Sequence, residues 1–312
     1  MLCNRWPAIY LSTRTTGKGA ASAAPFLLKG GKCVRCTEKI TPRWGRVLWI
    51  TKGDVELAVA MDFGIRVVHM SCVGCENLFY QQPMDCSDGF TTPGGWKLYG
   101  GHRLWLAPES DDSYYPDNDP VQYRITEDAV LVEQNVDPLL QIRKHLLVSF
   151  ETDDTVRIVQ QIENVSDQTL TGAAWGVNTL DAGGEAEICF GCTDVGSYNP
   201  QRVISLWSDT NLGDPRLHFE KDRLLAKYLP LNDYLKIGLY CNPGSAVFRN
   251  KGQVFELTFD AEAFELYPDN GCNFELYMCK QFTELESLGK KTTILPGRCA
   301  THVETWRLEK SC

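Results

Sequence analysis

The sequence lacks the features that mark membrane and nucleic-acid proteins. No apolar run approaches the roughly 20 residues that a membrane-spanning helix requires. Basic residues are also in deficit, since 31 Lys and Arg stand against 40 Asp and Glu and give a formal net charge of −9. Nucleic acids and anionic membrane surfaces attract basic patches, so neither is expected as a partner.

A helical pattern is missing as well. No long stretch repeats its apolar residues with the 3.6-residue period of an amphipathic helix, and no fixed-period repeat suggests a propeller or solenoid. From about Trp44 onward, short alternating segments follow one another, and Lys52-Gly53-Asp54 separates the first two as a hairpin turn would. Many strands without crossover helices predict an all-β antiparallel sandwich or barrel. Because nothing between Trp44 and Lys310 reads as a linker, we predict one sandwich domain over 44–312.

Acidic residues are absent from the first 37 positions, which carry Lys, Arg, Ser, Thr, Gly and Ala. This composition resembles a transit peptide. A disordered extension is the alternative, because the stretch offers no core. We therefore expect 1–43 to be a disordered or loosely attached extension and assign no function to it.

Metal sites have weak support. Thirteen cysteines, an odd number, include three Cys-x-x-Cys pairs: Cys33 and Cys36, Cys72 and Cys75, and Cys189 and Cys192. Zinc is one reading of these pairs; the favoured one is reduced thiols in a cytoplasmic protein without a secretory leader. The acidic stretch Glu109–Pro120 suggests calcium but lacks the Asp-x-Asp-x-Asp-Gly spacing, so an exposed loop over a cleft is favoured. We expect neither a metal nor a cofactor.

Three stretches carry a family resemblance. "YGGHRLWLAPES" places two glycines inside a strand, which marks a bulge or a close approach to the backbone. It is followed by "IENVSDQTLTGAAWGVNTLDAGG" and by a closing segment that runs from "FELYPDNG" through "FTELES" to "HVETWRLEK". In this order they resemble the galactose mutarotase-like superfamily, which includes the aldose 1-epimerases. They are most similar to a branch with a Gly-Gly-His/Asp-x-x-Trp-x-x-Pro-Glu strand. The resemblance covers roughly 44–310 and implies a large two-sheet antiparallel β-supersandwich.

The resemblance also implies a sugar cleft with a glutamate base and a histidine acid. "FTELES" matches the glutamate strand, so Glu286 or Glu284 is the expected base. Two residues apart, both carboxylates point to one face, and like charges side by side raise a pKa toward that of a general base. The mid-chain histidine of the epimerases has no counterpart, since this stretch offers Trp175 and Asn178.

The Gly-Gly strand supplies the remaining candidates. His102 is the expected acid or hydroxyl contact, because the neighbouring Gly100 and Gly101 are expected to make room for a ligand, with a core histidine as the alternative. Arg103 is expected to bind sugar hydroxyls or a carboxylate, with a salt bridge to Glu109 or Asp111 as the alternative. Strand alternation puts these two on opposite faces unless a bulge intervenes. Five aromatic or amide residues complete the prediction: Trp96 at the cleft rim, Trp175 and Asn178 as substrate contacts, and Trp105 with Trp306 in the core.

Three functions are compatible with this pattern. The first is a sugar-recognising isomerase of the aldose 1-epimerase type, with Glu286 or Glu284 as base and His102 as acid. The second is a sugar-binding protein without catalysis, which the missing histidine favours. The third is an accessory β-sandwich of a polysaccharide-processing system. The expected ligand is a small sugar or sugar derivative, and the lack of a cluster of Lys and Arg argues mildly against a phosphate.

Overall fold

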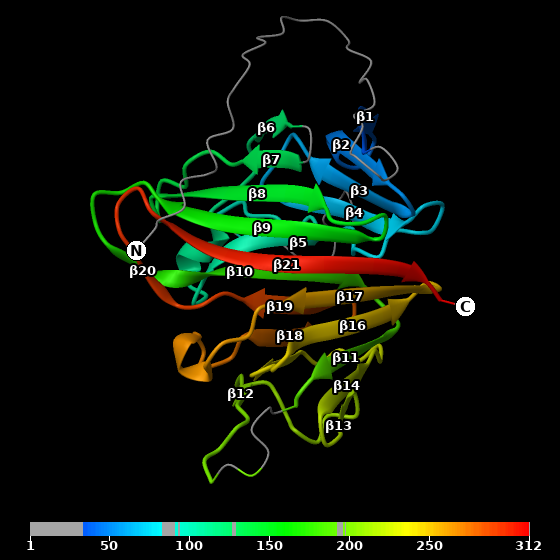
Figure 1. The fold of residues 1–312 in the computed structure, drawn as a ribbon, viewed down its shortest axis with the longest axis vertical. Helices are drawn as coiled ribbons and strands as arrows, with labels where there is room; N and C mark the ends of the chain where they lie inside the picture. Colours follow the sequence, from blue (N-terminus) through cyan, green and yellow to red (C-terminus); the bar gives the residue numbers. More distant parts are fainter. Residues whose placement is uncertain are drawn as a thin grey trace, which may run out of the picture.

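The computed structural model describes residues 34–82, 91–92, 94–126, 129–191, 196 and 198–311. Within them the chain forms two large antiparallel sheets, one in front of the other in Figure 1. Two short 3-10 helices, η1 (Asp111–Tyr114) and η2 (Phe264–Leu266), are the helical elements. None of the described helices is long and apolar enough to cross a membrane.

The first sheet has 11 strands and carries the candidate site. Its order is β1 (Arg35–Thr41), β2 (Gly45–Lys52), β3 (Val55–Ala60), β4 (Arg66–Cys72), β5 (Gly101–Ala107), β10 (Leu170–Asp181), β19 (Phe282–Leu288), β18 (Phe274–Met278), β15 (Leu235–Leu239) and β12 (Ile204–Leu206), with β20 (Thr292–Ile294) paired to β10. The predicted hairpin is confirmed, because Lys52 of β2 pairs with Val55 of β3.

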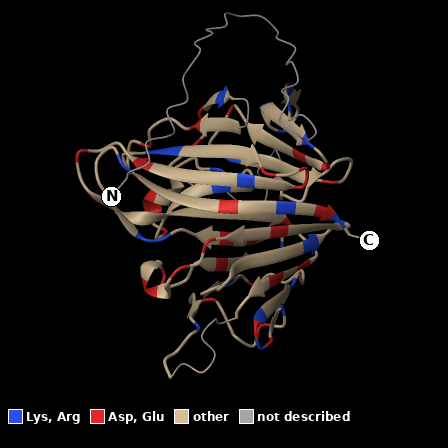
Figure 2. Ribbon diagram, in the orientation of Figure 1, with Lys and Arg blue, Asp and Glu red and all other residues tan. Residues whose placement is uncertain are grey.

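The second sheet has ten strands. Its order is β13 (Leu217–Phe219), β14 (Arg223–Lys227), β11 (Glu185–Cys189), β16 (Gly244–Asn250), β17 (Gln253–Phe259), β21 (Cys299–Lys310), β9 (Thr155–Asn164), β8 (Ile142–Phe150), β7 (Ala129–Glu133) and β6 (Gln122–Ile125). Acidic and basic residues are interspersed along both sheets (Figure 2). The all-β, two-sheet prediction is confirmed.

The first sheet begins before residue 44, where the sequence predicted the sandwich domain to start. β1 lies inside the segment 1–43 and pairs along its whole length with β2. It escaped prediction because it is an edge strand: Cys36 alone is buried, and the other positions show little apolar alternation. Short, polar edges are common in sheets, since they discourage pairing with another chain.

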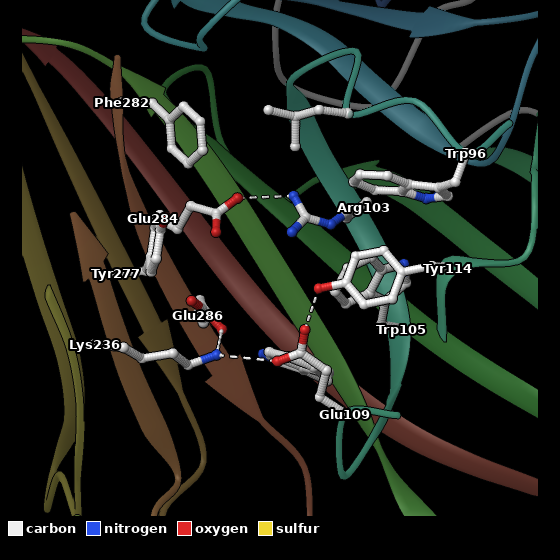
Figure 3. A pocket seen from close by; sticks show the side chains of 12 residues that line it. Trp96, Arg103, Trp105, Glu109, Tyr114, Lys236, Tyr277, Phe282, Glu284 and Glu286 are labelled. Carbon is white, nitrogen blue, oxygen red and sulfur yellow. Dashed lines mark hydrogen bonds and ion pairs between the residues drawn. The ribbon is translucent and has the colours of Figure 1, made fainter. Parts of the chain in front are cut away.

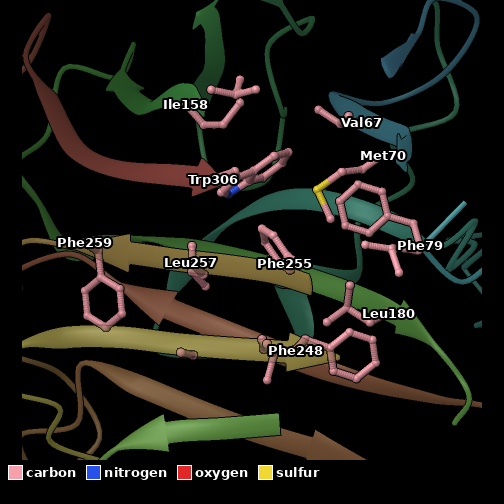
Figure 4. Close-up of a cluster of buried hydrophobic side chains, with 14 of the residues drawn as sticks. Val67, Met70, Phe79, Ile158, Leu180, Phe248, Phe255, Leu257, Phe259 and Trp306 are labelled. Carbon is pink, nitrogen blue, oxygen red and sulfur yellow. The ribbon is translucent and has the colours of Figure 1, made fainter. Parts of the chain in front are cut away.

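The main core fills the space between the sheets (Figure 4). β9 alternates buried and half-buried side chains along its length, as expected for a sheet with one face in the core. Trp306, Phe255 and Phe248 are among the largest fully buried side chains. β4 and β19 are buried at every position, so both of their faces are covered. The outer face of the first sheet is therefore packed as well.

The Gly100-Gly101 pair is explained by backbone contacts. Both residues have positive φ, +89° and +77°, and a Cβ would lie 2.0 Å from the Tyr80 carbonyl oxygen at Gly100 and 2.3 Å from that of Val67 at Gly101. The glycines thus make room for neighbouring chain. The expectation that they open a path for a ligand is wrong at these two positions.

The close approach of the Tyr80 carbonyl oxygen to Gly100 predicts that one added methyl group strongly destabilises the fold. Gly100→Ala should lower the free energy of unfolding by at least about 2 kcal/mol more than Gly74→Ala, because overpacking adds to backbone strain. Gly74 is the matched control, since its φ is +77° but nothing lies within 4 Å of its Cβ position. Urea denaturation measures both variants. Equal losses would show that strain alone accounts for the glycine.

Candidate active site

A second apolar cluster lies on the outer face of the first sheet, around β5, β10 and β19. It surrounds a pocket of about 210 Å³ (Figure 3). This is smaller than the roughly 300–1,000 Å³ of pockets that hold drug-sized ligands, so one small ring is the expected occupant. The lining residues are Trp96, Leu98, Arg103, Trp105, Glu109, Tyr114, Trp175, Lys236, Tyr277, Phe282, Glu284 and Glu286.

One side of the pocket is a set of touching aromatic rings. The ring centroids of Trp96 and Trp105 are 5.6 Å apart, and those of Trp105 and Trp175 are 5.4 Å apart. Tyr114, in η1, stands edge-on to Trp96 and Trp105 at 5.2 Å from each. The packed rings fix one another in place, and indole faces suit the apolar C–H faces of a sugar.

A buried ion pair between Arg103 and Glu284 also lines the pocket. Arg103 Nη1 donates to Glu284 Oε1 at 2.9 Å and to Thr179 Oγ1 at 2.9 Å, and the threonine hydroxyl donates to the same carboxylate oxygen at 2.7 Å. Strand register explains the meeting: Thr179 of β10 pairs with Glu284 of β19, and β5 borders β10 on its other side. Burial disfavours the guanidinium charge, but Glu284 outweighs it and raises the pKa of Arg103.

Lys236, on β15, forms the centre of a carboxylate cluster. Its Nζ lies 2.9 Å from Glu275 Oε2, 3.4 Å from Glu286 Oε2 and 3.7 Å from Glu109 Oε2. The Tyr114 hydroxyl donates to the other oxygen of Glu109. Burial disfavours the ammonium charge, but the three carboxylates outweigh it and raise the pKa of Lys236. The lysine therefore stays cationic at neutral pH.

Glu286 has the properties of a general base. Its side chain is 1 % exposed, and Oε1 has no hydrogen-bond partner among the described residues. Burial, together with the charge of Glu284, raises its pKa to about 7 despite the opposing charge of Lys236. A carboxyl group with a pKa near the working pH transfers protons efficiently in either direction.

The raised pKa predicts a pH dependence of stability. The pKa of Glu286 rises from 4.5 to about 7 on folding. Folded protein thus binds this proton more tightly than unfolded chain, and the stability it contributes is present below pH 4.5 and lost as the pH rises toward 7. Glu286→Gln should remove this loss, so unfolding midpoints of the wild type should fall relative to the variant across that interval. Parallel curves would contradict the assignment.

Five predicted site residues lie together in this pocket. Glu284 and Glu286 of β19, Arg103 of β5, Trp96 and Trp175 all line it. Arg103 pairs with Glu284, not with Glu109 or Asp111 as the alternative reading had it. Trp306 and Trp105 are both buried in apolar clusters, as predicted, and Trp105 also forms part of the pocket wall.

His102 and Asn178 lie elsewhere. The pairing of β5 with β10 runs without a shift through His102–Asn178 and Arg103–Val177, so no bulge turns both polar residues to one face. His102 points between the sheets, where Nδ1 lies 3.0 Å from Asn178 Oδ1 and 3.9 Å from Glu304 Oε2. It is fully buried, and burial lowers its pKa. Strand alternation thus turns His102 and Asn178 away from this pocket, and neither residue lines it.

Several pocket residues have no clear sequence signal. Lys236 sits in the ordinary strand "YLKIGLYC", and Tyr277 and Phe282 read as core aromatics. Register alone joins them, because Lys236 pairs with Tyr277 and Tyr277 pairs with Glu284. Glu109 and Tyr114 belong to the acidic stretch Glu109–Pro120, for which the sequence predicts an exposed loop over a cleft. Both residues line the pocket.

No group of three or more His, Cys, Asp or Glu side chains placed to hold a metal ion occurs in the described ranges. Cys33 and Cys192 lie outside those ranges, so their two pairs are described only in part. Cys36, Cys72, Cys75 and Cys189 are free thiols. In the acidic stretch, Asp117 is buried and pairs with Arg66 at 3.0 Å.

Comparison with known proteins supports the fold. No family model and no curated protein sequence matches the chain. Among solved structures it is similar to a galactose mutarotase-like protein from Lactobacillus casei, with 11% identity, a TM-score of 0.53, and 84% of this chain and 100% of that one covered. A galactose mutarotase-like protein from Clostridium acetobutylicum has 11% identity and a TM-score of 0.53, covering 89% and 99%. A candidate aldose 1-epimerase from Klebsiella pneumoniae has 11% identity and a TM-score of 0.57, covering 90% and 84%. The chain therefore has the galactose mutarotase-like two-sheet fold that its three motifs predicted.

Proposed function

We propose that the pocket on the outer face of the first sheet binds a small sugar and that Glu286 interconverts its anomers. The observation that carries this proposal is the position of Glu286: a buried carboxylate whose Oε1 has no partner in the described part of the chain, facing a ring-sized pocket with indole walls. The similarity to mutarotase-like structures supports the choice of ligand through fold alone.

The chemistry requires a proton acceptor at the anomeric hydroxyl. Glu286 takes the proton from O1, the O1 electrons form the C1 carbonyl, and the bond from C1 to the ring oxygen breaks. Lys236, 3.4 Å from Glu286, stabilises the negative charge that develops on the opening ring. Because His102 faces the core, we assign the proton that the ring oxygen takes up to water at the pocket mouth, where Glu109 is 37% exposed. Rotation about the C1–C2 bond and closure give the other anomer.

Other pocket groups would orient the sugar. The indole N–H groups of Trp96 and Trp175 are buried and have no acceptor among the described residues. Each can donate to a sugar hydroxyl, since indole nitrogen is a donor only. The faces of Trp96, Trp105 and Trp175 supply the apolar contact.

Free buried thiols such as Cys72 and Cys241 support the cytoplasmic location expected from the sequence.

A sugar-binding protein without turnover is the second candidate. The position of His102 favours it, because the acid expected from the family resemblance is turned away from the pocket. Both candidates use the same pocket and the same contacts, and they differ in the chemical step alone.

Proton NMR on the purified protein with a panel of free aldoses distinguishes the two. Saturation transfer reports contact, and exchange between the α and β anomeric signals reports turnover. We expect contact with accelerated exchange for at least one aldose. Contact without exchange would establish the binding protein, and neither signal across the panel would refute the proposed ligand class.

A further inference from the structure

The pocket has more carboxylates than cations. Arg103 and Lys236 are its two cations, and Glu109, Glu284 and Glu286 line it, with Glu275 behind Lys236. Lys236 alone faces three carboxylates within 3.7 Å. One ammonium cannot balance three ionised carboxylates, and burial together with the neighbouring carboxylates raises the pKa of both Glu275 and Glu286. The cluster therefore takes up protons, and another cation could replace them.

Both cations of the pocket are already paired with carboxylates. Arg103 donates through Nη1 to Glu284 and Thr179, and Lys236 lies among its three carboxylates. A sugar phosphate or uronate would bring further negative charge to a place where four carboxylates share two cations, and like charges close together repel. The pocket therefore disfavours anionic sugars.

Two carboxylate oxygens of the pocket, by contrast, are available to accept hydrogen bonds from a ligand. Glu286 is 1% exposed and its Oε1 has no partner among the described residues. Both hydrogen bonds to Glu284 go to Oε1, so Oε2 is not used by any described residue. Figure 3 shows these carboxylates pointing toward the space enclosed by the aromatic rings. A ligand cation placed there would find two carboxylate oxygens that no described residue contacts.

The aromatic walls already bind cations. The Arg103 guanidinium lies over the Trp105 ring at 4.3 Å, and Lys236 Nζ lies 4.8 Å from the Trp175 ring. The electron-rich ring faces attract positive charge most strongly in desolvated sites. The walls and the carboxylates thus favour the same kind of ligand group.

We propose that the natural ligand of this pocket is an amino sugar with a free ammonium group, bound in preference to the neutral parent sugar and to anionic sugars. The inference rests on the sugar-binding function proposed above. The ammonium lies among Glu286, Glu284 and Glu109 and replaces protons that these carboxylates would otherwise take up, while the ring packs on the indoles. The N-acetylated form lacks the charge and loses this interaction.

Titration of two series of four matched sugars tests the proposal. Calorimetry would compare galactosamine, N-acetylgalactosamine, galactose and galacturonic acid, and the corresponding gluco series, near pH 7, where an ordinary amine is mostly protonated and Glu286, with a pKa of about 7, is partly ionised. We expect the amine to bind at least about tenfold more tightly than its acetylated and neutral counterparts, and the uronate to bind most weakly. Glu109→Gln should lower the ratio between amine and neutral sugar, whereas Glu185→Gln, which removes an exposed charge on β11, should leave it unchanged.

The outcomes separate this proposal from the proposed function. Equal or tighter binding of the neutral sugar or the uronate would overturn the amino-sugar assignment and leave sugar binding intact. Binding of choline as tight as that of the amine would show that the pocket recognises a cation and not a sugar. No binding by either series would overturn both proposals.

Discussion

Glu286→Gln is expected to lower the rate of anomer exchange by about 10²- to 10⁴-fold, the usual contribution of a positioned general base. Sugar contact should persist, because glutamine has the same shape and can still hydrogen-bond to the anomeric hydroxyl. Folding should also tolerate the change, since the wild-type carboxyl is buried and its pKa of about 7 already favours the neutral form below that pH. Exchange rates from magnetisation transfer, measured beside saturation transfer, check both parts.

Two comparisons keep this result interpretable. Glu185→Gln makes the same chemical change at an exposed position of β11 and should exchange anomers at the wild-type rate. In the wild type, exchange should rise with pH through about 7 as Glu286 ionises. Undiminished exchange in Glu286→Gln would refute the base assignment.

Arg103→Ala is expected to lower the free energy of unfolding by about 3–5 kcal/mol, the usual cost of removing one partner from a buried ion pair. The side chains of Arg103 and Glu284 are 6% and 9% exposed, so water cannot replace the lost guanidinium. Cavity formation over Trp105 adds to the effect. Urea denaturation measures the loss, and sugar binding should weaken with it because Glu284 is no longer held in place.

The size of this effect has two internal checks. Arg157→Ala removes an exposed pair with Glu151, 41% and 48% exposed, and should cost less than about 1 kcal/mol. Adding Glu284→Gln to Arg103→Ala should restore part of the lost stability, because the unpaired charge is then absent. A double variant no more stable than Arg103→Ala would mean that packing, not charge, dominates.

The strands were predictable because their faces differ. Alternation in β9 and the turn between β2 and β3 are local signals, and they give an antiparallel all-β chain. The Glu284 and Glu286 pair was equally local, since residues two apart on a strand share a face. The order of the strands was available only through the family resemblance.

The rest of the site depends on contacts between distant strands. Lys236 reaches Glu286 because β15, β18 and β19 are neighbours, which nothing local to "YLKIGLYC" indicates. His102 was misplaced for a different reason: its flanking glycines suggested space for a ligand, whereas they accommodate the backbone at Tyr80 and Val67. Strict alternation places His102 and Arg103 on opposite faces, and the register of β5, β10 and β19 is needed to show that Arg103 shares the face of Glu286.

The most direct test of the central claim is a crystal structure of the protein with the sugar that shows the strongest saturation transfer. We predict the sugar ring against Trp96, Trp105 and Trp175, with the anomeric hydroxyl within hydrogen-bond distance of Glu286 Oε1. A sugar bound away from this pocket, or within it with the anomeric carbon remote from Glu286, would contradict the account.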